Sequence, residues 1–169
     1  MLAGTMPDRG LFEATTGVPV GHVEVAIAYS HVPATPDLAA TFGVEEGTKL
    51  LCRRYIFAVD GKPHQITHSY LLADMVEGTP LADPDNEQPG RGTLAQLHDI
   101  GALPEYATID IYARMPTPDE AATLGMTEGT PVLVDRRRGL FSGKVVFVAD
   151  GVAPADQVKV GLDIRLAQL

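Results

Sequence analysis

The sequence predicts an α+β domain in which short helices pack on one face of a largely antiparallel sheet. Two observations lead to this fold class. One long segment of the chain occurs twice, and each copy reads as a short helix followed by two strands joined by a tight turn. Other segments alternate apolar and polar residues with the two-residue period of a half-buried strand. Strands joined by tight turns run antiparallel, so most of the sheet is expected to be antiparallel.

The internal repeat relates residues 35–62 to residues 117–144 without a gap, at an offset of 82 residues. Fourteen of the 28 aligned positions are identical, which is far more than chance gives. Two copies are too few for a solenoid, which needs at least three stacked units. The duplication therefore indicates one domain whose two halves are related by a pseudo-twofold axis.

A short helix is expected at the start of each copy, over residues 36–42 and 118–124. In both copies a threonine precedes the helix as an N-cap, a proline takes the first helical position and a glycine follows the last. In the second copy, Thr117 and Glu120 have the spacing of a capping box. Helices of this length are not stable alone, so both must be held by packing.

The expected strands cover residues 18–31, 49–59, 64–72, 107–114, 132–141 and 145–152. The turns Asp60-Gly61 and Ser142-Gly143 stand at equivalent places in the two copies and predict two hairpins. Between the halves, residues 79–92 are rich in proline, glycine and aspartate and predict a loop. It leads into a further helix start, where Thr93 and Gln96 have the spacing of another capping box.

Composition and charge exclude several classes of partner. The chain carries 22 acidic and 13 basic residues, a net charge of −9, and so repels phosphate and anionic membranes. Its single cysteine allows no disulfide framework, which favours a cytoplasmic location. No apolar run approaches the length of a membrane span. Residues 1–16, rich in glycine, threonine and proline, are expected to be a leader or linker, and residues 17–169 the domain.

An ordered series of short motifs runs through both halves. It comprises Val32-Pro33, Leu38-Ala39, Phe42-Gly43, Arg53-Arg54, Asp60-Gly61-Lys62-Pro63, Ser69-Tyr70-Leu71, Ala113-Arg114-Met115-Pro116 and Gly129-Thr130-Pro131. From about Phe12 to the C-terminus this series resembles the UTRA domain, the effector-binding half of HutC-subfamily GntR transcription regulators. The resemblance implies a chorismate-lyase-like fold around a small-molecule pocket, and a homodimer. It also implies DNA binding through an N-terminal winged helix-turn-helix, for which the sequence has no room before Phe12. A domain cut from a longer regulator is therefore expected, with a stand-alone sensor as the alternative.

Two neighbouring arginines, Arg53 and Arg54, are the first candidates for ligand binding. Family members that bind phosphorylated sugars or other anions use arginines on this strand, and a guanidinium matches carboxylate and phosphate geometry. Adjacent residues of a strand point to opposite faces, so at most one of the two can face a given pocket. The alternative is that both pair with acidic neighbours on an exposed face.

The remaining ligand-binding candidates are Ser69, Tyr70, Gly90, Arg91, Gly92, Thr93, Tyr112 and Arg114. The glycine-rich stretch before the third helix resembles the entry that lies against the effector in the family, where backbone N–H groups form an anion site. Its alternative is an ordinary loop with a capped helix. Ser69 and Tyr70 end a strand where the resemblance places pocket-lining groups, and they could equally be plain strand residues. Tyr112 and Arg114 share a strand face that meets either the ligand or solvent.

Neither a metal nor an enzymatic site is expected. His64 and His68 lie four residues apart on a strand, which separates them by about 13 Å, too far for one metal ion. We find no catalytic motif, expect no cofactor, and place Cys52 in mid-strand beside apolar residues. The sequence thus predicts an effector-binding and dimerisation domain that senses a small anionic metabolite. A ligandless dimerisation module and a chorismate-lyase-like enzyme are the alternatives. The identity of the effector, and whether it relieves repression or drives activation, stay open.

Overall fold

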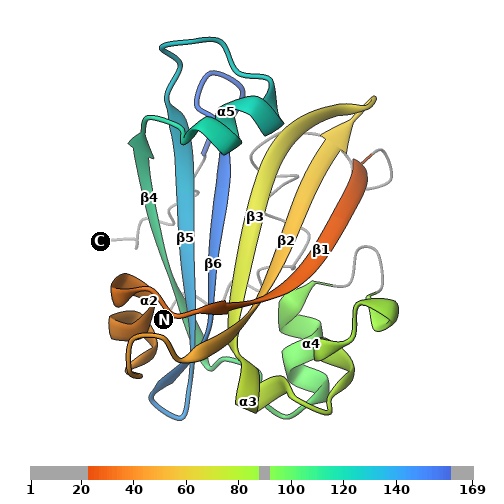
Figure 1. Cartoon of the computed structure of the whole chain (residues 1–169), viewed down its shortest axis with the longest axis vertical. Coiled ribbons are helices and arrows are strands. Elements are labelled where there is room, and N and C mark those ends of the chain that lie inside the picture. The colour runs from red at the N-terminus through yellow and green to blue at the C-terminus, as the bar shows by residue number, and fades with distance from the viewer. Residues whose placement is uncertain (1–22, 88–91, 161–169) are drawn as a thin grey trace, which may run out of the picture.

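The strands form one six-stranded antiparallel sheet in the order β1-β2-β3-β6-β5-β4 (Figure 1). The computed structural model of the chain describes residues 23–87 and 92–160. The strands are β1 (Val23–Pro33), β2 (Lys49–Val59), β3 (Lys62–Leu72), β4 (Tyr106–Arg114), β5 (Val132–Phe141) and β6 (Lys144–Pro154). The predicted strands 49–59 and 132–141 are confirmed to the residue, and the antiparallel α+β class is confirmed with them. Residues 1–16, the predicted leader, lie outside the described residues.

Short helices connect the strands: α2 (Pro36–Phe42), α3 (Ala73–Val76), α4 (Thr93–Asp99) and α5 (Pro118–Leu124), with 3-10 turns at Pro80–Ala82 and Pro84–Asn86. Both repeat helices end as predicted on a left-handed glycine, Gly43 at φ 70° and Gly125 at φ 60°. The capping box of Thr117 and Glu120 is confirmed. The capping box predicted at α4 is wrong, because Gly92 is the N-cap residue and α4 has no side-chain cap.

The two halves meet along a short ladder between β3 and β6. It pairs Ile66 with Val152 at one end and Tyr70 with Val148 at the other, so His68 lies opposite Asp150 at its centre. Adding 82 to the β3 residue of any pair and subtracting 82 from its β6 partner gives a pair of the same ladder, which places the pseudo-twofold axis between His68 and Asp150. The bulges of the two hairpins also fall at equivalent positions, after Phe57 in one and after Gly139 in the other. The duplication in the sequence is therefore also a duplication in the structure.

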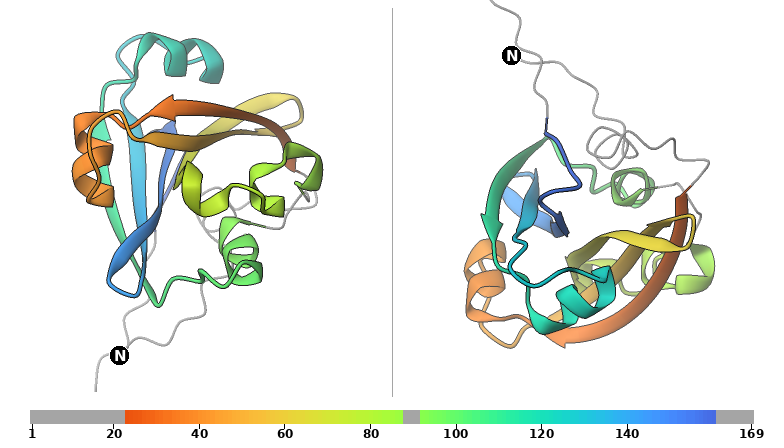
Figure 2. Two further views of the ribbon diagram at one scale, coloured as in Figure 1. Left: turned by 60° about the horizontal axis from the view of Figure 1, so that its bottom comes forward. Right: turned by 90° about the horizontal axis from the view of Figure 1, so that it is seen from above.

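Helices cover both faces of the sheet (Figure 2), so the prediction that they pack on one face is wrong. The neighbours Leu50 and Leu51 show the reason, since both are buried although they point to opposite sides. Leu50 packs in a cluster with α2, and a related cluster on that face holds α5. Leu51 packs with residues of α3 and α4 on the other face. Strands with two apolar faces need cover on both sides.

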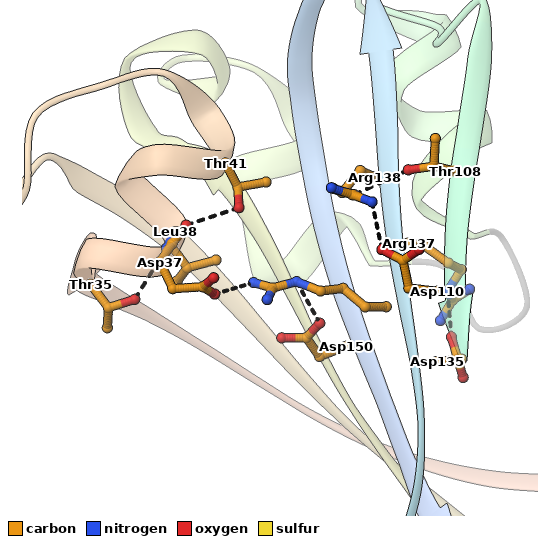
Figure 3. A network of polar contacts seen from close by, with 11 residues as sticks. Thr35, Asp37, Leu38, Thr41, Thr108, Asp110, Asp135, Arg137, Arg138 and Asp150 are labelled. Atoms are coloured by element: carbon orange, nitrogen blue, oxygen red, sulfur yellow. Dashed lines mark hydrogen bonds and ion pairs between the residues drawn. The ribbon is translucent and has the colours of Figure 1, made fainter. Parts of the chain in front are cut away.

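Two equivalent ion pairs tie each repeat helix to the opposite half. Arg54 on β2 contacts Asp119 at the start of α5, with 3.3 Å between Nη2 and Oδ2. The equivalent Arg136 on β5 contacts Asp37 at the start of α2, at 2.6 Å. Figure 3 shows Asp37 and Asp150 approaching the same guanidinium from two sides. Each helix thus packs over the strands of the other copy, and the halves interlock.

Candidate functional site

The candidate site is centred on Arg53, which lies on the face of β2 that α3 and α4 cover. Its side chain is completely buried, although arginine is almost never found buried without a partner. In the sheet it stands between Tyr29 of β1 and Ser69 of β3, which are its register partners on either side. Its guanidinium carbon lies 5.2 Å from the ring centroid of Tyr29 and 5.4 Å from that of Tyr55. Both distances suit a cation–π interaction.

Glu87 balances the charge of this arginine. It lies in the linker between the halves, shortly before α4, and its side chain is only 8% exposed. One carboxylate oxygen, Oε2, accepts hydrogen bonds from the Arg53 Nη2 group, from the Tyr29 hydroxyl at 2.5 Å and from the Gln96 side-chain amide at 3.1 Å. These are charge-assisted hydrogen bonds, which are stronger than neutral ones. The site therefore already holds one anionic group, supplied by the chain itself.

Several buried polar atoms of the site have no hydrogen-bond partner among the described residues. They are Nε and Nη1 of Arg53, Oγ of Ser69 and Oε1 of Gln96. A buried donor left unsatisfied costs roughly 1–3 kcal/mol, so native structures contain few of them. Four such atoms in one cluster form an incomplete hydrogen-bonding site. A ligand with an acceptor group for the guanidinium and hydroxyl, and a donor for the amide oxygen, would complete it.

The phenols of Tyr29 and Tyr55 remain uncharged at physiological pH because their pKa values are raised. Burial, and then the hydrogen bond to Glu87, raises the pKa of the Tyr29 phenol far above its ordinary value. Burial likewise raises the pKa of Tyr55, whose hydroxyl contacts the Thr93 side chain at the start of α4. The guanidinium of Arg53 is therefore the cationic group of the cluster, flanked by two uncharged rings.

The structure brings together some of the predicted ligand-binding residues. Arg53 and Ser69 are register partners on the neighbouring strands β2 and β3. The Thr93 side chain contacts the hydroxyl of Tyr55, whose ring lies against the Arg53 guanidinium. Gly92 is the N-cap residue of α4 beside it. Gly90 and Arg91 lie outside the described residues. The expectation that only one of the neighbouring arginines faces a given pocket agrees with this arrangement, because Arg54 points to the opposite face.

The other predicted residues lie away from this cluster. Arg54 contacts Asp119 and Thr123 of α5. Tyr70 is also on that opposite face, where burial raises its pKa to about 12. Arg114 makes two 2.7 Å hydrogen bonds to the carboxylate of Glu120. Tyr112 is exposed on β4, at the far edge of the sheet from β1. A ligand role for these four residues stays a prediction without support from the Arg53 cluster.

Four residues of the cluster were missed from the sequence: Tyr29, Tyr55, Glu87 and Gln96. Tyr29 carried a signal, since it was the single aromatic residue on the apolar side of the first predicted strand. Gln96 also stood out, but its spacing from Thr93 was interpreted as a helix cap. Glu87 lies in a stretch without periodicity, and its partner Arg53 is 34 residues away in the chain. No local pattern could have paired the two.

The equivalent place in the second half has different chemistry. The offset of 82 residues puts Ile111 at the position of Tyr29, Asp135 at that of Arg53 and Gly151 at that of Ser69. Asp135 is in ion-pair contact with Arg137 at 2.8 Å, and burial raises its pKa. A small cavity of about 20 Å³ lies beside it, lined by Gln65, Ile111, Leu133, Asp135, Ala153, Val158 and Val160. This volume holds about one water molecule.

Two further findings concern the described part of the chain. Within residues 23–87 and 92–160, no group of three or more histidine, cysteine, aspartate or glutamate side chains is arranged to hold a metal ion. No helix in these ranges has the length and apolar composition needed to cross a membrane.

Solved structures share this fold. The structure of a GntR-family transcriptional regulator superposes with a TM-score of 0.77 at 26% sequence identity, over 86% of this chain and 62% of that chain. The effector domain of PhnF from Mycobacterium smegmatis superposes with a TM-score of 0.72 at 19% identity, over 85% of this chain and 89% of that domain. The fold is that of the effector domains of GntR-family regulators.

Sequence comparison narrows this class to one family. An uncharacterised HTH-type transcriptional regulator from Streptomyces coelicolor is 32% identical over 139 residues, which are 81% of this chain and 52% of the relative. The chain thus spans about half the length of the curated relative it matches. The model of the UTRA domain matches residues 22–159. The chain belongs to the UTRA domain family, as its motifs indicated.

Proposed function

We propose that this chain is the effector-binding domain of a HutC-type GntR transcription regulator and that it senses a small anionic metabolite. The observation that carries the proposal is the buried Arg53, of which two guanidinium nitrogens have no hydrogen-bond partner among residues 23–87 and 92–160, as is also true of the neighbouring Ser69 hydroxyl. Effector domains with this fold belong to regulators, which supports a sensing role without enzymatic activity. In this proposal DNA is bound by a winged helix-turn-helix elsewhere in the regulator, in the cytoplasm.

An anion is favoured over a neutral ligand because of the charge in the cluster. Arg53 is held away from water between two aromatic rings, where its charge is screened less than at the surface. A carboxylate or phosphate group can accept from the guanidinium and from Ser69 together. The acidic chain as a whole repels anions, so selectivity for the effector depends on this local arrangement.

Thermal-shift screening of the domain against carboxylates, phosphorylated sugars and other anionic metabolites tests the proposal. A true effector should raise the melting temperature, and the rise should grow with the logarithm of its concentration above the Kd. The double variant Arg53→Met, Glu87→Gln removes both charges of the cluster together, and it should lose the response. Arg54→Ala, on the opposite face, should keep it. An effector whose binding survives the double variant would contradict the proposed site.

We also propose that the domain forms a homodimer through the β4 edge of the sheet. The exposed large apolar side chains of the described residues are Leu103, Tyr106, Ile111, Tyr112, Met115 and Val160. All except Val160 lie on β4 or within three residues of its ends in the sequence, and β4 is an edge strand. An open edge carrying apolar side chains favours pairing with a second copy.

Light scattering should therefore return about twice the chain mass of 18.0 kDa. Tyr112→Asp should shift the protein toward the monomer, because the exposed ring is then replaced by a charge on the pairing surface. The exposed Glu24→Lys on β1, the opposite edge, serves as the control and should leave the dimer intact. A wild-type mass equal to one chain at tens of micromolar would exclude this dimer.

A further inference from the structure

Glu87 occupies the place where a bound anion would be expected. Its Oε2 atom accepts from a guanidinium, a phenol and a side-chain amide that come from β2, β1 and α4. These three donors converge on one oxygen from three separate elements, which is how proteins hold the anionic group of a ligand. The carboxylate itself comes from the linker segment, not from the sheet that supplies the site.

The hydrogen bonding of this pair is incomplete. Glu87 uses one of the donor nitrogens of Arg53, whereas Nε and Nη1 have no partner among the described residues. Arginine pairs best with an anion when two parallel N–H groups reach two oxygens. A structural ion pair optimised for stability would use this bidentate geometry, as Arg114 and Glu120 do elsewhere in the chain. The contact of Glu87 with Arg53 is thus a poorer match than the same chain achieves on the opposite face.

We propose that Glu87 is a built-in competitor for the anion site. In the ligand-free domain its carboxylate holds the anion position on Arg53, Tyr29 and Gln96, and the anionic group of the effector binds by replacing it. This inference rests on the proposed function, since it concerns the same site. It adds that the affinity of the domain for its effector is set partly by a residue that the bound effector displaces.

Electrostatics makes the two occupants exclusive. A second anion placed on Nε and Nη1 of Arg53 while Glu87 remains would put two negative groups beside one buried cation, and like charges in a buried site repel strongly. The effector therefore binds only the fraction of molecules in which Glu87 has left the guanidinium. Its apparent affinity is reduced by that fraction. Removing the charge of Glu87 removes the competition.

The test compares wild type with Glu87→Gln, using inorganic phosphate and acetate as probes in calorimetric titrations. The amide keeps the size of the side chain but carries no charge, so the variant should bind one of the two probes at least about tenfold more tightly than wild type. The probe that binds more tightly indicates whether the effector carries a phosphoryl or a carboxylate group. Asp85→Asn, an exposed residue of the same linker, is the matched control and should bind as wild type does.

A second readout guards against a folding defect. Loss of the Glu87 charge leaves Arg53 uncompensated, so Glu87→Gln should melt at a lower temperature than wild type in buffer without anions. Added phosphate or acetate should then raise its melting temperature more than it raises that of wild type. Glu87→Ala, which also removes the side chain, should show the same gain if the glutamine variant fails to fold.

The outcomes separate this inference from the proposed function. Tighter anion binding by Glu87→Gln that disappears in Arg53→Met, Glu87→Gln supports both. Weaker binding by Glu87→Gln, together with loss of binding in the double variant, would mean that Glu87 contacts the ligand. The proposal that Glu87 competes with the effector would then be wrong, whereas the proposed anion site would still be supported. If neither probe binds any of these proteins, removing Glu87 has exposed no anion site and the inference fails. The proposed function is then decided by the effector screen alone.

Discussion

The two halves of this domain have the same backbone plan and opposite chemistry at one equivalent place. The first half buries an arginine between two tyrosines, beside a serine and a glutamate from the linker. The second half has Asp135 at that position, packed over Gly151 and in contact with Arg137. Strand register, bulges, turns and helix caps are shared by the two copies. The comparison teaches that the two copies kept one backbone framework, whereas the cluster proposed to bind an anion is present in only the first of the two equivalent places.

The largest difference in unfolding free energy between the halves is expected for variants of Arg53 and of its equivalent Asp135. Arg53→Met removes one partner of a buried ion pair and leaves Glu87 uncompensated, which should cost about 3–5 kcal/mol of unfolding free energy. Asp135→Asn should cost far less, because burial raises the pKa of Asp135 and so already disfavours its charged form. Urea unfolding of both variants measures this. Equal losses would contradict the view that the charge of Asp135 contributes less to the free energy of unfolding than the charge of Arg53.

A smaller effect on the free energy of unfolding is expected from replacing the residues next to these two charged side chains in the sheet, Gly151 beside Asp135 and Ser69 beside Arg53. A side chain at Gly151 would place its Cβ atom 2.3 Å from Oδ2 of Asp135, so Gly151→Ala should destabilise by about 1–3 kcal/mol. Ser69→Ala removes a buried hydroxyl that has no hydrogen-bond partner in the described part of the chain, so it should leave stability nearly unchanged. Unfolding midpoints in urea compare the two variants. Adding Asp135→Ala to Gly151→Ala should restore most of the loss, and failure to do so would show that the contact is not the cause.

The smallest effect concerns the repeat helices. Glu120 of α5 accepts from the Thr117 backbone and from Arg114, whereas α2 has Leu38 at this position. The hydrogen bonds with Arg114 hold the pKa of Glu120 below its ordinary value of 4.5. A lowered pKa in the folded state contributes stability above pH 4.5 that is lost as the pH falls through the folded value. Glu120→Gln should therefore cost about 1 kcal/mol at neutral pH and progressively less below pH 4.5.

Thr35→Ala in α2 is the matched control for this pH dependence. Its cap is an uncharged hydroxyl that accepts from the Leu38 amide at 3.3 Å, so its cost should be the same at pH 3.5 and pH 7. Denaturant titrations at these two pH values compare the variants. A penalty for Glu120→Gln that does not change with pH would show that its charge contributes nothing to the cap.

Local signals predicted most of the fold. Thr-Pro before each repeat helix, glycine after it, and the Asp60-Gly61 and Ser142-Gly143 turns are decided by a few neighbouring residues, and these predictions were confirmed. The helices on both faces of the sheet were not predicted, because apolar and polar residues alternate along β1 and β4 and this pattern indicated a sheet with one buried face. The central strands have two, as Leu50 and Leu51 show.

The candidate site was only partly predictable. Arg53 and Ser69 came from the family resemblance, and their register depends on a hairpin that the sequence also predicted. Glu87 reaches the site from a linker, and the contact depends on how that linker folds back between α3 and α4. Such a contact leaves no periodic trace in the sequence, because it joins residues far apart in the chain. The choice between Arg53 and Arg54 likewise needed the structure.

The position of the pseudo-twofold axis also bears on how such a domain can evolve. In a symmetric dimer of half-chains, the residue on the axis always faces its own copy, so an acid must face an acid and a base a base. Joining the halves in one chain removes that restriction. At the centre of the β3–β6 ladder the chain now has His68 opposite Asp150, two different residues where a dimer of identical halves allows only one. The same freedom lets an arginine and an aspartate occupy the two copies of one position.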